Sequence, residues 1–294
     1  MTKVLVTGAL GFVGSNLVER LIEEGGYEIY GIDNLSSPSS DKSYTYPGVK
    51  YHLVDLRSYN DMKEAHLPEF DIIFHCAALA RIQPSFENPG LSIHNNSVST
   101  LTVLEMARQT KAKVVYAGSS TFHAGPMKNP YAFSKWQGEQ MCKMYSEIYD
   151  VPTSIVRFFN VYGPRCPKTG DYATVVGIFE ELADNDKTLT ITGDGTQRRD
   201  FTHVDDICQG LIAISKGDHL GEEFNLGNGK NTSINELAEM FGSYKPLNKE
   251  YIPARPGEAK DTMADISKAK ASGYNPTVEL KDYIQSYMED EIKE

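Results

Sequence analysis

The segment that governs the architecture of this chain is Thr7-Gly8-Ala9-Leu10-Gly11-Phe12-Val13-Gly14. It joins a short apolar run at residues 3–7 to residues 16–24, where apolar side chains recur at helical spacing. Glycines permit a tight turn, close approach of the backbone to a pyrophosphate, and close packing of a helix on a strand. The amino terminus of the helix then offers N–H groups to the phosphates. The segment therefore predicts a dinucleotide-binding turn, although its G-x-x-G-x-x-G spacing is one residue wider than G-x-G-x-x-G.

The alternation of apolar runs and amphipathic stretches continues to about residue 160. The polar, serine-rich segment of residues 36–46 is predicted to be a surface loop. Further strands are predicted at residues 28–32, 51–54, 71–75, 113–117 and 153–158, and helices near residues 97–109 and 131–149. Such alternation gives a parallel sheet with helices on both faces. We therefore predict an α/β protein with a Rossmann-like, doubly wound parallel sheet in residues 1–160. Beyond that point Gly, Pro and charge increase, which predicts a smaller α+β substrate-binding lobe in residues 161–294, with some segments returning to the main sheet.

The composition excludes several classes of protein. The 294 residues hold 29 Lys and Arg against 40 Asp and Glu, a net charge of −11, whereas a nucleic-acid binder needs a surplus of cations. No apolar run approaches the ~20 residues that span a bilayer, and the amino terminus lacks the features of a signal peptide. The four cysteines are scattered and form no C-x-x-C pair, which argues against a disulfide frame or a zinc site. These features predict an acidic cytoplasmic protein without nucleic-acid, membrane or metal partners.

Polar residues at the ends of the predicted strands indicate which dinucleotide is bound. Asp33 lies 19 residues after Gly14, where its carboxylate would accept from both ribose hydroxyls and repel a 2′-phosphate. No Arg occurs among residues 34–36, so the sequence favours NAD over NADP. Asp55 and His75 end the third and fourth strands, where ligands of open parallel sheets bind. For His75, however, we favour a packed histidine between apolar neighbours over a catalyst.

Tyr131 and Lys135 stand four residues apart in a predicted helix, so both lie on one face of it. An ammonium group beside a phenol lowers the pKa of the phenol, and a phenolate can act as general base on a sugar hydroxyl. The spacing alone is uninformative, because the chain contains three Tyr-x-x-x-Lys pairs. Only this pair follows a strand that ends in hydroxyl groups, those of Ser119 and Ser120. Position therefore selects Tyr131 and Lys135.

A series of motifs extends along nearly the whole chain: T-G-A-L-G-F-V-G (7–14), D-N-L (33–35), F-H-C-A-A (74–78), residues 96–100, Y-A-F-S-K (131–135), R-F-F-N-V-Y-G-P-R (157–165), G-D-G-T-Q-R-R-D-F-T-H-V-D-D (193–206), R-P-G-E (255–258) and A-D-I-S-K-A (264–269). With these motifs the chain resembles the extended short-chain dehydrogenase/reductases. Within them it is similar to the NAD-dependent nucleotide-sugar epimerases of the UDP-glucose 4-epimerase type. The motifs in this order are highly specific for the superfamily and less specific for the reaction.

The resemblance implies a set of site residues. The implied catalytic set is Ser120, Tyr131 and Lys135, with Ser120 preferred to Ser119 because it lies five residues before Gly125. The residues implied to hold NAD are Gly8, Gly11, Phe12, Val13, Gly14, Asp33, Asn34, Asp55, Leu56, Ala77, Ala78, Asn96, Tyr131, Lys135 and Phe158. Those implied to hold the nucleotide sugar are Ser120, Tyr131, Phe159, Asn160, Arg199, Arg255, Glu258 and Thr262.

The residues after Ser120 bear on the reaction. Related dehydratases carry Asp-Glu directly after the hydroxyl residue, decarboxylases carry a Glu two places on, and 3,5-epimerase/reductases usually have a Cys in this stretch. Here Thr121-Phe122-His123 follows, which favours NAD-dependent epimerisation at C4 of a UDP-hexose through a transient 4-keto sugar. A dehydratase, decarboxylase or reductase of the same fold is the alternative, and a non-catalytic NAD-sensing protein is a more distant one.

The chain departs from the family pattern in two places. The usual V-Y-G is His123-Ala124-Gly125, and only ten residues separate Ser120 from Tyr131, where relatives have a longer loop. We interpret His123 as a loop residue rather than a catalyst. A shorter loop is expected to open the mouth of the site or to alter the choice of sugar.

The nucleotide sugar is an anion, and this acidic chain must bind it with local positive charge. Arg199 and Arg255 lie at the phosphate-binding positions that the resemblance implies, and Glu258 matches an acid that contacts the nucleotide ribose. Thr262 matches the position that limits bulk near C2, where a small residue would admit an N-acetyl group. The implied substrates are therefore UDP-glucose and UDP-galactose, with tolerance of N-acetylated forms. The resemblance also implies a homodimer formed through the helices near residues 97–109 and 131–149.

Overall fold

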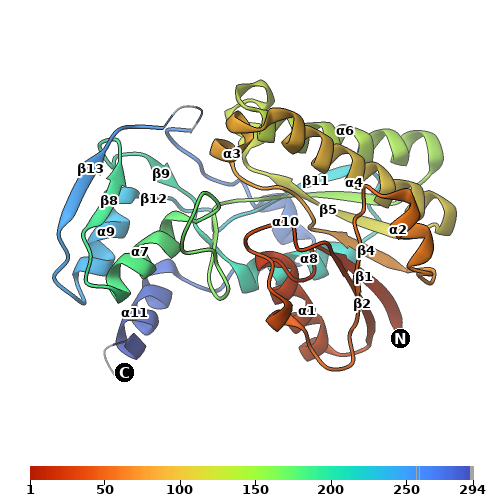
Figure 1. Cartoon of the computed structure of the whole chain (residues 1–294), viewed down its shortest axis with the longest axis horizontal. Helices are drawn as coiled ribbons and strands as arrows, with labels where there is room; N and C mark the ends of the chain where they lie inside the picture. Colours follow the sequence, from red (N-terminus) through yellow and green to blue (C-terminus); the bar gives the residue numbers. More distant parts are fainter. Residues whose placement is uncertain (256, 258, 292–294) are drawn as a thin grey trace.

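A parallel sheet of seven strands forms the centre of the molecule, in the order β11-β6-β5-β4-β1-β2-β3 (Figure 1). The computed structural model describes residues 1–255, 257 and 259–291. The strands of the sheet are β1 (Thr2–Thr7), β2 (Tyr27–Asp33), β3 (Lys50–Leu53), β4 (Ile72–His75), β5 (Lys113–Ser119), β6 (Thr153–Phe158) and β11 (Glu222–Leu226). All neighbouring strands in it are parallel, so the predicted fold class is confirmed.

Helices cover both faces of the sheet because successive side chains of a strand point to opposite faces. Val4 and Val6 pack in one apolar core, whereas Leu5 between them belongs to another. The first core lies under α1 (Phe12–Glu24) and α8 (Val204–Ser215). The second lies under α2 (Tyr59–Glu64), α4 (Pro89–Thr110) and α6 (Pro130–Tyr149).

The chain reverses its direction of travel across the sheet between β1 and β4. It first moves outward from β1 to β2 and β3, and then crosses back to β4, β5 and β6 on the other side of β1. In open parallel sheets the connections diverge at such a point and leave a crevice at the carboxyl ends of the strands. The topology therefore places a ligand site beside Thr7 and His75, the paired last residues of β1 and β4.

The second half of the chain contributes both to this sheet and to a separate lobe. β11 pairs with β6, and α8 and α10 (Ser267–Ala271) pack near it. The lobe has its own apolar core, built mainly by α7 (Val175–Asp184), β8 (Leu189–Thr192), α9 (Ile234–Gly242) and α11 (Leu280–Glu291). Its short strands are β7 (Val161–Tyr162), β9 (Arg198–Arg199), β10 (Thr202–His203), β12 (Thr232–Ser233) and β13 (Lys249–Ile252).

Some elements differ from the sequence expectations. α4 begins at Pro89, eight residues before the predicted start, because its first half buries polar side chains such as Asn95 and Asn96 and shows no apolar period. The short elements α3 (Ile82–Glu87), α5 (Thr121–Ala124), η1 (Lys42–Tyr44) and η2 (Pro126–Lys128) were not predicted, since each has too few residues for a periodic signal. Within the described part of the chain, no helix is both long and apolar enough to cross a membrane.

Candidate active site

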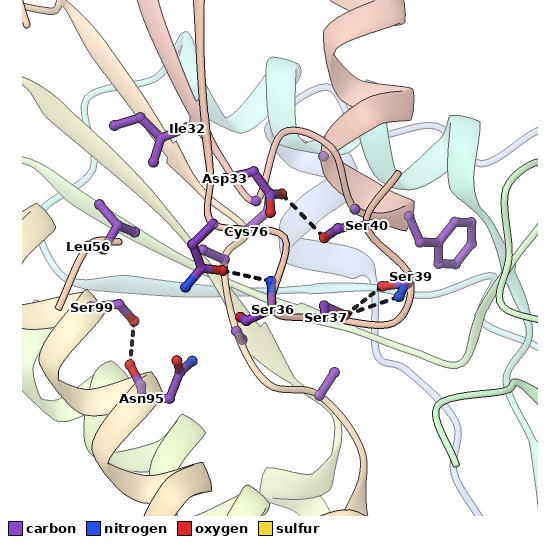
Figure 2. A pocket seen from close by; sticks show the side chains of 18 of the residues that line it. Ile32, Asp33, Ser36, Ser37, Ser39, Ser40, Leu56, Cys76, Asn95 and Ser99 are labelled. Atoms are coloured by element: carbon purple, nitrogen blue, oxygen red, sulfur yellow. Dashed lines mark hydrogen bonds between the residues drawn. The ribbon is translucent and has the colours of Figure 1, made fainter. Parts of the chain in front are cut away.

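A cleft opens at the carboxyl ends of β1, β2, β3 and β4, where the topology predicts a ligand site. Eleven of the residues expected to hold NAD line it: Gly8, Gly11, Phe12, Val13, Gly14, Asp33, Asn34, Asp55, Leu56, Ala77 and Ala78. Figure 2 shows Asp33, Leu56 and Cys76 converging on this cleft from three different segments. Asn96, Tyr131, Lys135 and Phe158 are not among the described residues that line it.

The glycine turn between β1 and α1 is shaped by close backbone approaches. Gly8 has φ of 67°, and a Cβ on Gly8 would lie 2.9 Å from the Cα of Ala77. A Cβ on Gly14 would lie 2.0 Å from the carbonyl oxygen of Gly8, so no larger residue fits there. Gly11 is the N-cap of α1 and provides no capping side chain. The helix therefore begins at the cleft with backbone N–H groups suited to a phosphate, and this cradle fits a dinucleotide.

Asp33 ends β2 and is buried, with its carboxylate at the cleft. One oxygen accepts from the backbone N–H of Leu35 at 2.8 Å, and the other from that of Leu10 at 3.1 Å and from the Ser40 hydroxyl at 3.4 Å. These donors fix the carboxylate at the place where the ribose of a dinucleotide is expected.

The predicted surface loop after β2 also lines the cleft, which the sequence analysis did not foresee. Ser36, Ser37, Ser39 and Ser40 border the cleft below Asp33 (Figure 2). Tyr46, further along this segment, accepts a hydrogen bond from Arg165 Nη1 at 3.1 Å, and Arg165 also pairs with Glu19 on α1. Pro167 and Tyr172 reach the cleft from the segment after Arg165. The run of serines signalled only a polar loop, since nothing local indicates that a distant arginine secures it.

An arginine that the sequence analysis had not considered also reaches the cleft, directly after the expected residues Asp55 and Leu56. Arg57 lines the cleft and forms an ion pair of 2.6 Å with Asp55. Its hydrogen bonds lower the pKa of Asp55 to about 2. The positive charge of Arg57 is thereby neutralised by the Asp55 carboxylate. The cleft therefore stays acidic around Asp33 and Asp55, and this favours NAD over NADP.

The residues implied to be catalytic lie where β5 meets the start of α6. Asn129 caps α6 by accepting from the N–H of Ala132, and Pro130 occupies the first turn, so the helix starts just before Tyr131. The hydroxyl whose proximity lowers the pKa of the Tyr131 phenol is that of Ser119, the residue before the implied one. Ser120 is the N-cap of α5, and its N–H donates to the carbonyl of Phe158. The structure thus pairs Tyr131 with the last residue of β5.

Lys135 lies one turn further along α6 and is almost completely buried. Its ammonium group stands 4.4 Å from the centre of the Tyr116 ring, and burial lowers its pKa to about 8. Burial raises the pKa of Tyr131, and this outweighs the hydrogen bond with Ser119 and the charge of Arg81, which both lower it. The prediction that the phenol pKa lies below its usual value is therefore wrong for this structure, because it neglected desolvation.

Asn96 is buried beside the cleft and organises the backbone near it. Its amide accepts from the N–H of Leu79 at 2.8 Å and donates to the carbonyl of the same residue at 3.1 Å. It also donates to the hydroxyl of Ser134, next to Lys135. The side chain thus links the segment after β4 to α6.

The residues after β6 have different environments. Phe158 is partly buried against the core under α1 and α8. Phe159 is only 1% exposed, and its ring centre lies 5.6 Å from that of His123 with the two rings tilted by 37°, so Phe159 offers little surface to a ligand. Asn160 donates to the Asp200 carbonyl at 3.0 Å and to the Thr262 hydroxyl at 3.2 Å.

Three of the expected nucleotide-sugar positions come together from distant segments. Arg199 lies on β9, and Thr262 donates its N–H to the carbonyl of the neighbouring Arg198. Asn160 reaches the same place through its bond to Thr262. Arg255 is exposed after β13, and Glu258 lies outside the described residues.

Two histidines singled out by the sequence have structural partners. His75 is buried, with ring nitrogens 2.8 Å from the Thr7 hydroxyl and 3.1 Å from the Thr100 hydroxyl, and burial lowers its pKa to about 3. The interpretation of His75 as a packed residue is confirmed. His123 is exposed on α5, where it lies 3.3 Å from the Asn225 side chain.

Comparisons with known proteins agree with this geometry. The model of the NAD dependent epimerase/dehydratase family matches residues 4–227. The UDP-glucuronate 4-epimerase of Thermodesulfobacterium geofontis is 34% identical, over 90% of this chain and 88% of its own. The UDP-glucose 4-epimerase of Mycolicibacterium smegmatis is 33% identical, over 98% and 97%. The solved structure of the UDP-glucose 4-epimerase of Thermotoga maritima with UDP-glucose has a TM-score of 0.91 at 28% identity, over 99% of both chains.

Proposed function

Because the chain belongs to the NAD dependent epimerase/dehydratase family, we propose that it inverts C4 of a UDP-linked hexose, UDP-glucose or UDP-galactose. The observation that carries the proposal is the pairing of the Tyr131 phenol with Ser119 where β5 meets α6. Arg81 connects this pair to the cofactor cleft, because it lines the cleft and its charge acts on Tyr131. A base, a hydroxyl partner and a dinucleotide cleft are what reversible oxidation at one carbon requires.

The chain's own residues would move the proton. Tyr131 takes the proton of the C4 hydroxyl and later returns it, while Ser119 or Ser120 holds that hydroxyl in line with the phenol. Lys135 provides buried positive charge one turn away. Bound NAD would supply the hydride acceptor and donor that reversible oxidation at C4 requires. Since the cycle has no net redox change, the cofactor is expected to stay bound.

The glycine turn, Asp33 and Asn34, and the segments around Asp55 and Ala77 would hold the cofactor. For the nucleotide sugar we propose Phe159, Asn160, Arg199, Arg255, Glu258 and Thr262, with the arginines on the diphosphate. The Thr262 hydroxyl is held by Asn160 and by the N–H of Asp200, so this small side chain has a fixed position. We propose that it admits an N-acetyl group at C2. An unchanged ratio of N-acetylated to plain substrate turnover in Thr262→Tyr would contradict that role.

A dehydratase or decarboxylase of the same family is the competing function. Both eliminate a group after the 4-keto sugar forms, and their relatives carry a carboxylate just after the hydroxyl residue. In this chain that stretch is α5, with the sequence Thr121-Phe122-His123-Ala124, which has no carboxylate. The absence of an acid here supports epimerisation over elimination.

The test is conversion of UDP-galactose by the purified protein without added cofactor, with products identified by chromatography and mass. We expect UDP-glucose, of unchanged mass, and no conversion by Tyr131→Phe of equal melting temperature. Loss of water or carbon dioxide from any substrate in a panel with UDP-glucuronate and UDP-N-acetylglucosamine would favour the lyase. If protein shown to contain NAD converts no substrate, and Tyr131→Phe behaves like the unmodified chain, the proposal that this chain is an enzyme is contradicted.

We also propose a cytoplasmic homodimer. Leu101 on α4 and Met144 and Ile148 on α6 are 42–61% exposed, on the two helices that cover one face of the sheet (Figure 1). Apolar groups exposed in this way favour association. The cysteines are all free thiols, as expected in a reducing compartment. Sedimentation should give twice the chain mass of 32.7 kDa, and Ile148→Asp should lower it toward the monomer.

A further inference from the structure

We propose that Asp200 is a positioning residue for the nucleotide-sugar site, because its carboxylate holds together the segments that carry Arg199 and Thr262. The inference rests on the function proposed above, which assigns Arg199 and Thr262 to the substrate. Asp200 lies between β9 and β10 and is completely buried. A buried carboxylate is costly unless hydrogen bonds compensate it, so its donors show what it organises.

Three backbone N–H groups from two separate segments donate to the Asp200 carboxylate. One oxygen accepts from Asn228 at 2.7 Å, and the other accepts from Gly229 at 3.0 Å and from Ala264 at 2.9 Å. The first two residues follow β11, the edge strand of the main sheet, whereas Ala264 lies two residues after Thr262. One carboxylate therefore fastens the segment of Thr262 to the end of the main sheet.

The backbone that leads to Asp200 is paired with the same segment. Arg198 donates its N–H to the carbonyl of Lys260 at 2.9 Å and accepts from the N–H of Thr262 at 3.1 Å. The N–H of Asp200 donates to the Thr262 hydroxyl at 3.4 Å. Arg199 lies between these contacts, so its position depends on how the neighbouring segment is held.

A third segment meets Asp200 through its main chain. The side chain of Asn160, which follows β6, donates to the Asp200 carbonyl at 3.0 Å and to the Thr262 hydroxyl at 3.2 Å. The segments are closely packed, because a Cβ on Gly227 would lie 2.8 Å from a carboxylate oxygen of Asp200 and 2.3 Å from the Cβ of Ala264. Asp200 is thus the residue at which the ends of β6 and β11 meet the segment of Thr262.

The charge of Asp200 separates a positioning role from an electrostatic one. A negative charge near a diphosphate site weakens the binding of the anion. If the carboxylate acted only through its charge, its removal would therefore tighten the binding of UDP. If it holds Arg199 in place, its removal weakens that binding.

The test compares Asp200→Asn with Asp206→Asn, which changes a similarly bonded carboxylate elsewhere. Asp206 on α8 is also buried and accepts from the backbone N–H groups of Thr277 at 2.9 Å and Val278 at 3.1 Å. In both variants, either orientation of the new amide turns its NH₂ group toward a backbone N–H donor, so both should lower the melting temperature. Neither Thr277 nor Val278 belongs to the proposed nucleotide-sugar site.

The expected result is a selective loss of nucleotide affinity. In folded protein that contains NAD, the Kd of UDP from calorimetry should rise about tenfold in Asp200→Asn and less than about twofold in Asp206→Asn. The KM for UDP-galactose should rise with the Kd, while kcat stays within about threefold, because Tyr131 and the cofactor cleft are unchanged. Gly227→Ala keeps the carboxylate but drives Ala264 away from it, so it should weaken UDP binding as well and decides the question if Asp200→Asn does not fold.

An unchanged or lower Kd of UDP in folded Asp200→Asn would overturn the proposal. So would an equal rise in Asp206→Asn, which would reduce Asp200 to a contribution to stability. UDP binding needs no turnover, so a protein that binds UDP but epimerises no sugar contradicts only the proposed function. An unmodified chain that binds no UDP would contradict both.

Discussion

The glycine turn of the cofactor cleft and the proposed catalytic edge, where β5 meets α6 at Tyr131, are built on different principles. The turn uses the backbone of eight consecutive residues, and its selectivity comes from what a Cβ would strike. The proposed catalytic edge brings Ser119 from β5 to Tyr131 and Lys135 of α6 and depends on the charge and hydroxyl groups of individual side chains. The glycine turn should therefore be sensitive to substitutions that change side-chain volume and hardly sensitive to those that change charge. The catalytic edge should show the opposite sensitivity.

Tyr131→Phe should have the largest effect. It removes only the phenolic oxygen, so kcat should fall by about 10²–10⁴-fold, the usual contribution of a general base. The bound NAD content, measured after denaturation, and the melting temperature should change little, because Tyr131 does not line the cofactor cleft. Loss of NAD together with turnover would show that the two regions are not separable.

Gly14→Ala should damage the cofactor cleft instead. The new methyl group would lie 2.0 Å from the Gly8 carbonyl, so α1 must move, at a cost of about 1–3 kcal/mol in unfolding free energy and most of the bound NAD. Gly90→Ala is the control, because this helical glycine has nothing within 4 Å and should gain up to about 1 kcal/mol. Chemical denaturation measures the unfolding free energy of both variants. Full NAD content in Gly14→Ala would contradict the assignment of the turn.

Lys135 predicts a pH dependence of stability. Its pKa is lowered from 10.5 to about 8 by burial, so between these values the unfolded chain binds more protons and stability rises with pH. The gain from this residue should be about 1–2 kcal/mol between pH 8 and 9.5. Buried thiols such as Cys142, with raised pKa, oppose it in the same range, so the measurement is the difference from Lys135→Met. Parallel curves for the two proteins would show that Lys135 titrates normally.

Arg165→Ala should have the smallest effect, on cofactor retention. It removes the hydrogen bond to Tyr46 and the ion pair with Glu19, which hold the serine-rich wall of the cleft. Each partly exposed contact of this kind contributes about 1 kcal/mol or less, so NAD release should quicken about two- to fivefold. Arg108→Ala is the matched control, since Arg108 also pairs with a glutamate and stands over a tyrosine ring, on the outer side of α4. Equal rates of NAD release in both variants would show that Arg165 does not hold the serine-rich wall of the cleft in place.

The contrast between the two regions also explains which features of the structure the sequence predicts and which it misses. Six of the seven strands of the main sheet, β1 to β6, and the helices α1 and α6 follow from local periodicity, and the glycine turn follows from one contiguous motif. The start of α4 was missed because Asn95 and Asn96 are buried through hydrogen bonds rather than by apolar packing. The serine loop was interpreted as surface, because the contact between Arg165 and Tyr46 spans 119 residues.

The catalytic edge was only partly predictable for the same reason. Tyr131 and Lys135 lie on one helix, but the choice between Ser119 and Ser120 depends on how β5 ends. Arg81 gave no signal, since its place at the cleft follows from a backbone conformation and from a hydrogen bond to the Tyr172 carbonyl. The desolvation that raises the pKa of Tyr131 depends on everything packed around it, and no spacing of residues encodes it.

The most direct test of the proposed epimerisation follows the hydrogen at C4. UDP-galactose carrying deuterium at C4 should give UDP-glucose that retains this deuterium at C4, with NAD neither added nor consumed. Retention is expected because the hydrogen returns to the sugar from the same bound cofactor. Exchange of the label with solvent, or a product that has lost water or carbon dioxide, would contradict it.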